Sequence, residues 1–544
     1  MDSLLVNGVT YWLPESNQDV IRLANEAAAS KQIICLRGAA HSFPIIGTLE
    51  RGSTTGRSYR YVMLSKMNAV TIKGSTVTVQ AGCHLGIDPS DPTGISTKKN
   101  SLLYKLDQKG LAFPDLGGIT HQTVGGFLST GSSGGSTMFS FEDAVLSVDI
   151  VTFEKGKASV KTFKRPPKGK DNSNDPFYGV AVAGLGLFGV IVSATFQCVP
   201  KFFIAGQEAT SGEADCEIDL FGAGGKKPNL EQFLMTKRGI KPTPEYTRMM
   251  WWPQAGVNKM VVWKAWRENL ANAKKWAYPK DSNPSSQPLK PYQEVPWING
   301  TPTLGNMGGC LMYTAIGRWP DWLLDTMGDT PYTRNIVQMV DQVFYPMIFP
   351  AVIGLFVKED GPEGPQRFCD VGYTGIPMDN QMSDQLMPVW FTELWIPINQ
   401  TRKVMNALKK FYSAKPENAG TFGCEIYASK SNKFWLSPSY ATDVVRIDIF
   451  WFAYNKGNVR EFYKKFWDLL APFKFRPHWG KYLPAANGAQ GVKYLAKNYP
   501  KWQAWRDLRE KLDPQQVFVN DYWRDHLGIE SPMASTKKTL KKKS

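Results

Sequence analysis

Two stretches of small residues have the composition of a binding site for a large anionic cofactor. Arg37-Gly38-Ala39-Ala40-His41-Ser42 directly follows the apolar segment Ile33 to Leu36, so we expect His41 at the end of a strand, beside exposed backbone. About eighty residues later, the run 116–136 contains seven glycines. Because glycine lets backbone N–H groups approach a ligand closely, the two stretches together predict a site that holds both ends of a dinucleotide.

A third glycine-rich segment, at residues 184–189, has the spacing G-x-G-x-x-G of a nucleotide-binding fingerprint. That fingerprint opens a helix after the first strand of a βαβ unit. Here the residues that follow, 190–196, are mostly β-branched or apolar and predict a strand instead. The pattern therefore disfavours a nicotinamide dinucleotide.

Polar residues interrupt two apolar segments near the C-terminal end of the chain. Glu425 and Tyr427 share one face of a predicted strand that starts at Cys424, and Arg446 and Asp448 share one face of a second predicted strand. Burying such groups is costly unless they are paired or functional. Two interpretations stay open: catalytic side chains, with Arg446 placing positive charge beside Tyr427 if the strands are neighbours, or a structural network of the arginine and the carboxylates.

The cysteine pattern and the apolar runs exclude several classes of protein. Seven cysteines are scattered over 544 residues without a CxxC pair, which disfavours a zinc site or a disulfide framework and fits a reducing compartment. No cluster of ligating residues has metal-ligand spacing, so no metal is expected. The first residues lack the features of a signal peptide, and the longest apolar run, Val343 to Val357, is broken by prolines and too short to span a bilayer. We expect a soluble, intracellular protein, either cytoplasmic or organelle-associated.

The formal net charge of +16 would suit an anionic partner. Five lysines fall in the tail 533–544, which is predicted to be a basic, disordered end able to make a weak contact with a membrane surface. Basic and aromatic residues are not interleaved as they are on a nucleic-acid-binding face, so no nucleic acid is expected as a partner.

The elements that must position these residues are of mixed type. Ser16 and Asp19 have the features of a helix start, and apolar residues at 20, 23, 24 and 27 would share the buried face of that helix. Strands are predicted at 33–36, 77–82 and 144–151. After residue 203, Pro and Trp become frequent, with a predicted surface loop at 280–291, a strand at 391–398 and a helix at 402–412.

Together these motifs resemble the vanillyl-alcohol oxidase family of flavoproteins, which have a PCMH-type FAD-binding domain. In that family a strand ends in an R-G-x-x-H-S turn, as residues 37–42 do, and its histidine is commonly bonded to the flavin. The run 116–136 resembles the second pyrophosphate loop, and 184–191 the segment beside the adenine. Residues 476–481, Arg-Pro-His-Trp-Gly-Lys, and 513–520, Asp-Pro-Gln-Gln-Val-Phe-Val-Asn, are similar to motifs of the alditol and aldonolactone oxidase branch. The layout also resembles the flavin-linked cholesterol oxidases of the family.

The resemblance implies an α+β protein with a two-domain PCMH-type FAD-binding fold and a large α+β substrate (cap) domain. Residues 1–202 would form the FAD-binding domain, 203–475 the cap domain, and 476–532 a segment that returns to the FAD domain before the tail. FAD would be held covalently through His41, and by one link at most, because no cysteine lies near Thr120. The chain departs from the family pattern at Ser133, where a histidine is frequent, and at Tyr427, where the family's Glu-x-Arg has its arginine.

The resemblance also assigns site residues. Those expected to bind the cofactor are Arg37, Gly38, Ala39, Ala40, His41, Ser42, Gly117, Gly118, Thr123, Gly125, Gly126, Ser129, Thr130, Gly131, Ser133, Gly135, Gly189, Ile191, Lys481 and Asn520. Those expected to support catalysis are Glu425, Tyr427, Arg446, Asp448, His478 and Lys481. Lys481 would stabilise negative charge on the reduced ring, and His478 would hold the substrate hydroxyl.

The implied activity is oxidation of a CH–OH group by hydride transfer to the flavin, with oxygen as acceptor and hydrogen peroxide as product. The substrate would be an aldonolactone or polyol, or a bulkier alcohol such as a sterol. Eight tryptophans between Arg248 and Val357 favour an apolar substrate, although the same residues could pack a second core. The alternative is a non-catalytic protein that keeps the flavin fold for binding or storage.

Overall fold

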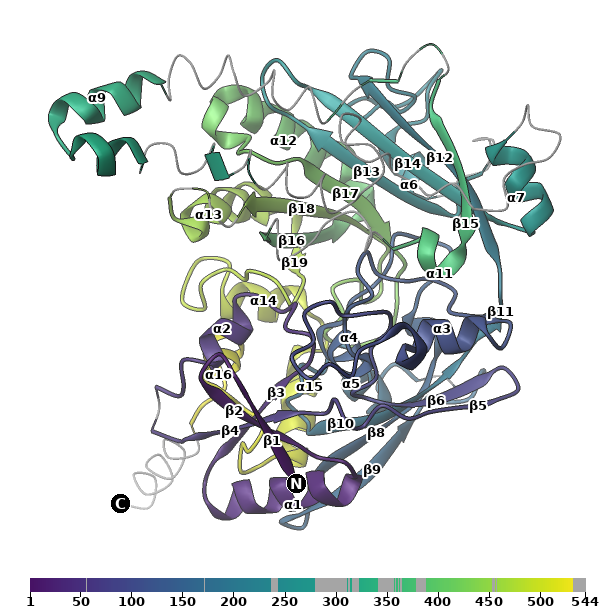
Figure 1. The fold of residues 1–544 in the computed structure, drawn as a ribbon, viewed down its shortest axis with the longest axis vertical. Coiled ribbons are helices and arrows are strands. Elements are labelled where there is room, and N and C mark those ends of the chain that lie inside the picture. Colours follow the sequence, from purple (N-terminus) through teal and green to yellow (C-terminus); the bar gives the residue numbers. More distant parts are fainter. Residues whose placement is uncertain are drawn as a thin grey trace.

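The computed structural model describes residues 1–54, 56–170, 172–235, 243–278, 322–340, 364–377, 388–452 and 457–531, together with residues 311, 314, 315, 357, 359, 360, 362 and 455. Figure 1 shows a lower lobe that contains the N-terminus and an upper lobe built on a large sheet. The tail 533–544, the loop at 280–291, Cys310 and most of the run from Val343 to Val357 lie outside the described residues.

The lower lobe begins with a small sheet in the order β1-β2-β4-β3. Its strands are β1 (Asp2–Val6), β2 (Val9–Leu13), β3 (Ile33–Arg37) and β4 (Tyr59–Met63), and β3 and β4 run parallel. Helix α1 (Asn17–Ala29) starts at Ser16, whose side chain accepts a hydrogen bond from the Asp19 N–H, and buries residues 20, 23, 24 and 27. The predicted helix start, its buried face and the strand that leads into residue 37 are confirmed.

An antiparallel five-stranded sheet, ordered β5-β6-β10-β8-β9, completes the lower lobe. The strands are β5 (Val70–Lys73), β6 (Thr76–Gln80), β10 (Val190–Gln197), β8 (Val145–Glu154) and β9 (Lys157–Lys164). The residues after the G-x-G-x-x-G spacing form β10, as predicted, and not a helix. Gly189 lies directly before β10, where a Cβ would lie 2.2 Å from the Val151 carbonyl oxygen, so this glycine permits close strand packing.

The run 116–136 is not a continuous loop, because helix α4 (Val124–Thr130) forms within it. The Thr123 side chain caps the helix by accepting from the Gly126 N–H, and Val124, Phe127 and Leu128 are buried. These apolar positions, spaced i, i+3 and i+4, give the segment a buried face in spite of its glycines. Short elements nearby are α2 (Ile45–Leu49), α3 (Leu102–Asp107), β7 (Leu111–Ala112), α5 (Phe177–Val180) and β11 (Val199–Pro200).

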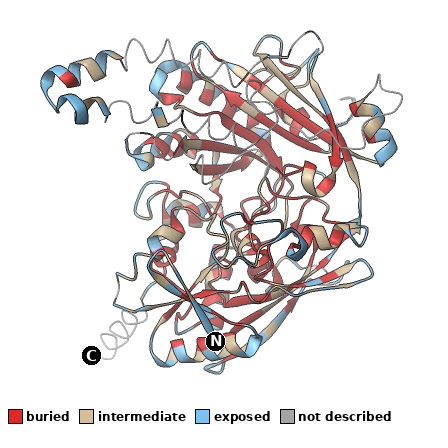
Figure 2. Ribbon diagram, viewed as in Figure 1, coloured by how far each residue is buried: buried red, intermediate tan, exposed pale blue. Residues whose placement is uncertain are grey.

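The upper lobe is an eight-stranded antiparallel sheet in the order β15-β12-β14-β13-β17-β18-β16-β19. In chain order its strands are β12 (Phe203–Gly212), β13 (Tyr246–Trp252), β14 (Lys259–Glu268), β15 (Gln366–Val371), β16 (Val389–Pro397), β17 (Cys424–Ser429), β18 (Val444–Phe452) and β19 (Arg476–Pro477). Helices α6 (Leu230–Leu234), α12 (Thr401–Ala414) and α13 (Val459–Leu470) share one apolar cluster with this sheet. The strands of this sheet are among the most buried parts of the chain (Figure 2).

The chain after β19 returns to the lower lobe (Figure 1). Its helices are α14 (Val492–Asn498), α15 (Trp502–Leu512) and α16 (Asp521–Leu527). The Ile34 N–H donates to the Val517 carbonyl at 2.8 Å, and Asp521 Oδ2 accepts from the Ser53 hydroxyl at 2.8 Å. The other α-helices in the described residues are α7 (Leu270–Ala277), α9 (Pro331–Met339) and α11 (Gly372–Gly375).

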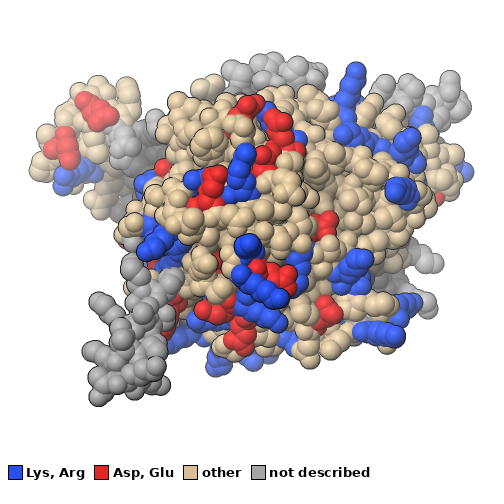
Figure 3. Space-filling view, turned by 90° about the horizontal axis from the view of Figure 1, so that it is seen from below, with Lys and Arg blue, Asp and Glu red and all other residues tan. Residues whose placement is uncertain are grey.

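The structure bears on two expectations from the sequence, namely a partner attracted by positive charge and the lack of a membrane-spanning segment. Seen from below, Lys and Arg side chains are intermixed with Asp and Glu (Figure 3), so this face does not present a field of one sign. In the described part of the chain, none of the helices combines the length and the apolar character that crossing a bilayer requires.

Candidate active site

A cavity of about 330 Å³ lies where the two lobes meet. Most of the predicted site residues line it, including the whole turn from Arg37 to Ser42 and all six residues expected to support catalysis. Three predicted cofactor ligands, Gly131, Gly135 and Gly189, do not line it. Gly131 ends α4 with φ +67° and Gly135 packs where a Cβ would lie 2.9 Å from the Thr247 carbonyl oxygen. These glycines serve backbone packing around the cavity.

The turn that carries His41 is held from two sides. A Cβ on Gly38 would lie 2.7 Å from Thr123 Oγ1, so glycine at this position lets the turn pack against the start of α4. Arg37 forms a half-buried ion pair with Glu50, which also accepts a hydrogen bond from the Tyr11 hydroxyl at 2.8 Å. Arg37 therefore anchors the turn rather than offering an unpaired charge to a ligand.

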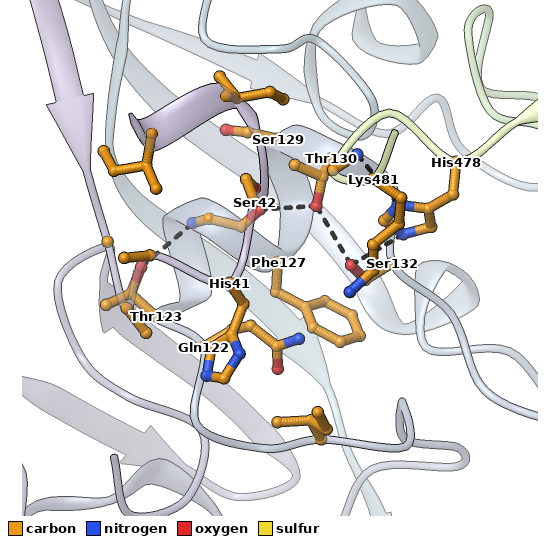
Figure 4. Close-up of a pocket in the computed structure, with 18 of the residues that line it drawn as sticks. His41, Ser42, Gln122, Thr123, Phe127, Ser129, Thr130, Ser132, His478 and Lys481 are labelled. Carbon is orange, nitrogen blue, oxygen red and sulfur yellow. Dashed lines mark hydrogen bonds between the residues drawn. The ribbon is translucent and has the colours of Figure 1, made fainter. Parts of the chain in front are cut away.

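His478 is a buried, neutral histidine in one defined tautomer. Burial lowers its pKa to about 4, so the imidazole is uncharged at neutral pH. Its Nδ1 accepts from the Gly480 N–H at 3.0 Å, which leaves the proton on Nε2, 3.3 Å from Ser132 Oγ. Because the Thr130 hydroxyl donates to the Gly126 carbonyl, the Ser132 hydroxyl donates to Thr130, and this chain of hydrogen bonds links His478 to α4 (Figure 4).

Short strand β19 puts the C-terminal motif beside the large sheet. It pairs with β16, and the His478 N–H donates to the Glu393 carbonyl at 2.9 Å. Lys481 follows in a turn closed by its N–H on the His478 carbonyl, and its ammonium lies 3.8 Å from the centre of the Phe391 ring. Lys481 and His478 lie next to each other on one side of the cavity (Figure 4).

The two polar strand faces predicted from the sequence are neighbours. Strands β17 and β18 pair with Tyr427 opposite Arg446 and Glu425 opposite Asp448. The Arg446 guanidinium donates to the Tyr427 hydroxyl at 2.5 Å, and that hydroxyl donates to Asp448 Oδ2 at 3.0 Å. Arg446 also donates to the carbonyls of residues 133 and 134 at 3.0 Å each, which ties the sheet to the glycine-rich segment.

Glu393 on β16 completes the network, and the sequence analysis did not select it. Arg446 Nε donates to Glu393 Oε1 at 2.8 Å, and the Trp395 indole N–H donates to the same oxygen at 2.7 Å. Glu393 is a charged residue within the apolar segment 391–398, and Arg446 was selected because it interrupts an apolar strand in the same way. The same criterion would therefore have selected Glu393. Arg248 on β13, which pairs with Glu425 at 3.2 Å, is a second residue that was missed.

Burial and nearby charge shift the pKa values of the three carboxyl groups in different directions. Burial alone would raise the pKa of Glu393, but the adjacent Arg446 outweighs it and keeps that pKa below its usual value. Burial, reinforced by the charges of Glu393 and Glu425, raises the pKa of Asp448 well above its usual value. Burial also raises the pKa of Glu425, with Arg248 acting against it. Arg446 therefore favours the ionised form of Glu393, whereas burial favours the protonated forms of Asp448 and Glu425.

Of the tryptophans that suggested an apolar substrate, none of those in the described residues lines the cavity. Trp251 and Trp263 are buried in the cores, Trp266 and Trp276 pack against each other with ring centres 4.8 Å apart, and Trp322 is exposed. Trp297 and Trp319 lie outside the described residues. The tryptophans that the structure describes fill cores or face solvent, so they do not support the prediction of an apolar substrate.

The described lining fits a flavin dinucleotide. Every carboxylate in it comes from the upper sheet, whereas the lower lobe supplies glycines and the hydroxyls of Ser42, Thr123, Ser129 and Thr130. A surface of small and hydroxyl residues without carboxylates suits a pyrophosphate. Gln122 Oε1 is buried at this surface without a hydrogen-bond partner among the described residues, and could accept a ligand N–H.

The comparisons agree with this geometry. A family model described as D-arabinono-1,4-lactone oxidase matches residues 321–526. The chain is 22% identical to L-gulonolactone oxidase of Mus musculus over 94% of this chain and 93% of that protein. It is also 22% identical to D-arabinono-1,4-lactone oxidase of Yarrowia lipolytica, covering 95% and 94%.

Among solved structures, a cholesterol oxidase from Brevibacterium sterolicum superposes with a TM-score of 0.65 at 16% identity, covering 95% of this chain and 94% of that one. A chitooligosaccharide oxidase superposes with a TM-score of 0.55 at 12% identity, covering 94% and 90%. The structure thus has the α+β fold of the PCMH-type FAD-binding oxidases, as predicted. Within that fold, the sequence is similar to the D-arabinono-1,4-lactone oxidase family over residues 321–526 and to L-gulonolactone oxidases over most of its length.

Proposed function

We propose that this protein is an FAD-dependent oxidase that oxidises a CH–OH group of a sugar lactone or related polyol and passes the electrons to oxygen, forming hydrogen peroxide. The observation that carries the proposal is the single cavity in which the turn at His41 meets the His478–Lys481 motif and the network around Arg446. Bound FAD would supply the hydride acceptor.

His41 is the proposed point of covalent attachment. It lies at the end of β3, lines the cavity and is half-buried, so its imidazole can reach a ligand there. The small neighbours Gly38, Ala39 and Ala40 leave room for a planar ring beside it. Attachment would fix the ring relative to the upper sheet.

Glu425 is the residue best suited to accept the substrate hydroxyl proton. Its raised pKa makes the carboxylate a stronger base near neutral pH, which favours general base catalysis. His478 has its proton on Nε2 and therefore donates a hydrogen bond, which suits holding an oxygen atom rather than removing a proton. Lys481 adds a cation that can stabilise negative charge developing in the cavity.

The polarity of the cavity supports a hydroxylated substrate over a sterol. Ionisable groups from three strands, Glu393, Glu425, Arg446 and Asp448, line it together with Lys481. A polyhydroxyl ligand can pair with such groups, whereas each buried polar group left unpaired by an apolar ligand costs about 1–3 kcal/mol. The names of the relatives, gulonolactone and arabinonolactone oxidases, point to the same substrate class.

A substrate panel with peroxide readout tests the proposal. Aldonolactones and alditols should give peroxide, and sterols and aromatic alcohols should give far less at equal concentration. Higher efficiency with a sterol would contradict the proposed substrate class. A yellow protein whose flavin no alcohol reduces would instead support a binding or storage role.

A further inference from the structure

The proposed attachment residue, His41, lies in a group of three side chains whose other two members, Asp88 and His121, have no part in the proposed catalysis. The rings of His41 and His121 have centres 5.2 Å apart, and one ligating atom from each of His41, Asp88 and His121 lies within 4.8 Å of the others. Both histidines line the cavity, but Asp88 does not, and it is 4% exposed. The carboxylate therefore lies behind the histidines, away from the ligand.

Backbone pairing brings the loops of Asp88 and His121 together. The Leu85 N–H donates to the Gln122 carbonyl at 2.9 Å, and the Gly86 N–H donates to the Thr120 carbonyl at 2.6 Å. A Cβ on Gly86 would lie 2.1 Å from Thr120 Oγ1, so only glycine allows this approach. With Gly38 packed on Thr123 in the same way, two close glycine contacts assemble the three segments of the cluster.

Asp88 is itself held in place. Its N–H donates to Ser96 Oγ at 2.8 Å, its Oδ1 accepts from the Ser90 N–H at 2.9 Å, and its Oδ2 lies 3.6 Å from His84 Nε2. A buried carboxylate fixed behind a pair of imidazoles orients the rings and favours the histidine that gains a proton. Neither Asp88 nor His121 was among the site residues predicted from the sequence.

We propose that His121 and Asp88 are positioning residues for flavin attachment: they hold the His41 imidazole toward the cavity and take up its proton when it bonds to the flavin. This inference rests on the proposed covalent link through His41.

The attachment balances with oxygen as the oxidant. A bond forms between a His41 ring nitrogen and the methyl carbon at the dimethylbenzene edge of the flavin, while one N–H and one C–H bond break. The two electrons and two protons released reach oxygen, giving hydrogen peroxide, and the linked flavin ends oxidised. The proton from His41 leaves through His121, whose positive charge Asp88 stabilises.

The experiment follows attachment directly, without substrate. Full-length protein is incubated with FAD, acid is added at intervals, and the flavin in the washed precipitate and the fluorescence of the denatured band are measured relative to the flavin bound before acid. Asp88→Asn and His121→Gln should slow attachment at least about tenfold, as expected for loss of a positioned proton acceptor. Asp91→Asn is the matched control, because Asp91 holds the same loop through Thr93 and Ser96 without joining the cluster.

Each other outcome overturns the inference in a distinguishable way. Attachment at the original rate in both variants would show that the cluster has no part in it, and equal slowing in D91N would show a loop-folding effect only. If the unmodified chain and H41A both release all their flavin, the covalent link itself is wrong. A stoichiometric zinc ion that D88N and H121Q lose would assign the cluster to a metal instead.

Discussion

The Arg446 guanidinium on β18 donates through Nε to the Glu393 carboxylate on the neighbouring strand β16 at 2.8 Å, and both side chains are almost completely buried. Arg446 also donates to the carbonyls of residues 133 and 134, so the same side chain joins strands β16 and β18 of the upper sheet to the glycine-rich segment of the lower lobe. Arg446 therefore contributes one of the contacts that join the two lobes at the site, beside the hydrogen bond between Ser132 and His478.

Removing one partner of this pair should destabilise the protein strongly. Glu393→Ala leaves the Arg446 charge buried without its carboxylate, and we expect the free energy of unfolding to fall by about 3–5 kcal/mol in denaturant titrations. Asp468→Asn breaks the exposed ion pair with Lys464 and should change the free energy of unfolding by less than about 1 kcal/mol. Similar losses in both variants would contradict the assigned importance of the buried pair.

Histidine 478 should make stability depend on pH in a defined direction. Its folded-state pKa of about 4 lies below the ordinary value of 6.5, so the unfolded chain binds more protons between these values. Its contribution to the free energy of unfolding is present above about pH 6.5 and is lost as the pH falls toward 4, by about 3 kcal/mol in all.

The measurement is the free energy of unfolding at several pH values for the unmodified protein and for His478→Gln, which does not titrate. The difference between the two proteins should shrink as the pH falls through this window. A difference that is independent of pH would mean that the pKa of His478 is the same in the folded and unfolded protein, which would contradict the assigned shift.

Lys481 and Glu425 should support flavin reduction rather than folding. Lys481→Met and Glu425→Gln each remove a group aimed at charge that develops in the transition state, so flavin reduction should slow roughly 10²–10³-fold while FAD stays bound. Stopped-flow absorbance checks the rate. Lys474→Met, at an exposed lysine in the turn before β19, is the control and should behave like the unmodified protein. If either variant reduces its flavin at the rate of the unmodified protein, the catalytic role of the substituted residue is wrong.

Disturbing the close contact between Gly38 and Thr123 should weaken cofactor binding. Gly38→Ala would place a methyl group 2.7 Å from Thr123 Oγ1 and push the His41 turn off α4, so we expect weaker FAD binding and less attached flavin. Gly47→Ala, whose new methyl would meet nothing closer than 3.7 Å, should bind FAD normally. Equal binding by both variants would show that the turn tolerates displacement.

Features set by local sequence could be predicted, and those set by packing could not. The cap at Ser16, the strand leading to Arg37 and the strand at 190–197 follow from neighbouring residues alone. Helix α4 was not predicted because its glycines disfavour a helix. Its apolar spacing stabilises the helix only because Phe127 and Leu128 pack into the core, which the local sequence does not show. The polar strand faces were predicted, but their partner Glu393 depends on which strands pair.

The tryptophans and the Asp88 cluster are further features that depend on tertiary packing and could not be predicted from the sequence. The residue type predicts that Trp251 and Trp263 are buried, but it does not predict whether they pack in a core or line a cavity. Likewise, no spacing in the sequence brings Asp88 to His41, because the contact depends on backbone pairing between residues 84–86 and 120–123.

The central claim is that a hydroxyl group of a sugar lactone reduces a flavin bound in this cavity. The most direct test mixes the purified, yellow protein with an aldonolactone in the absence of oxygen and follows the visible flavin band. We expect the band to bleach in the unmodified protein, to bleach far more slowly in E425Q, and to return with release of peroxide when air is admitted. A flavin that stays oxidised with every aldonolactone and alditol would contradict the account.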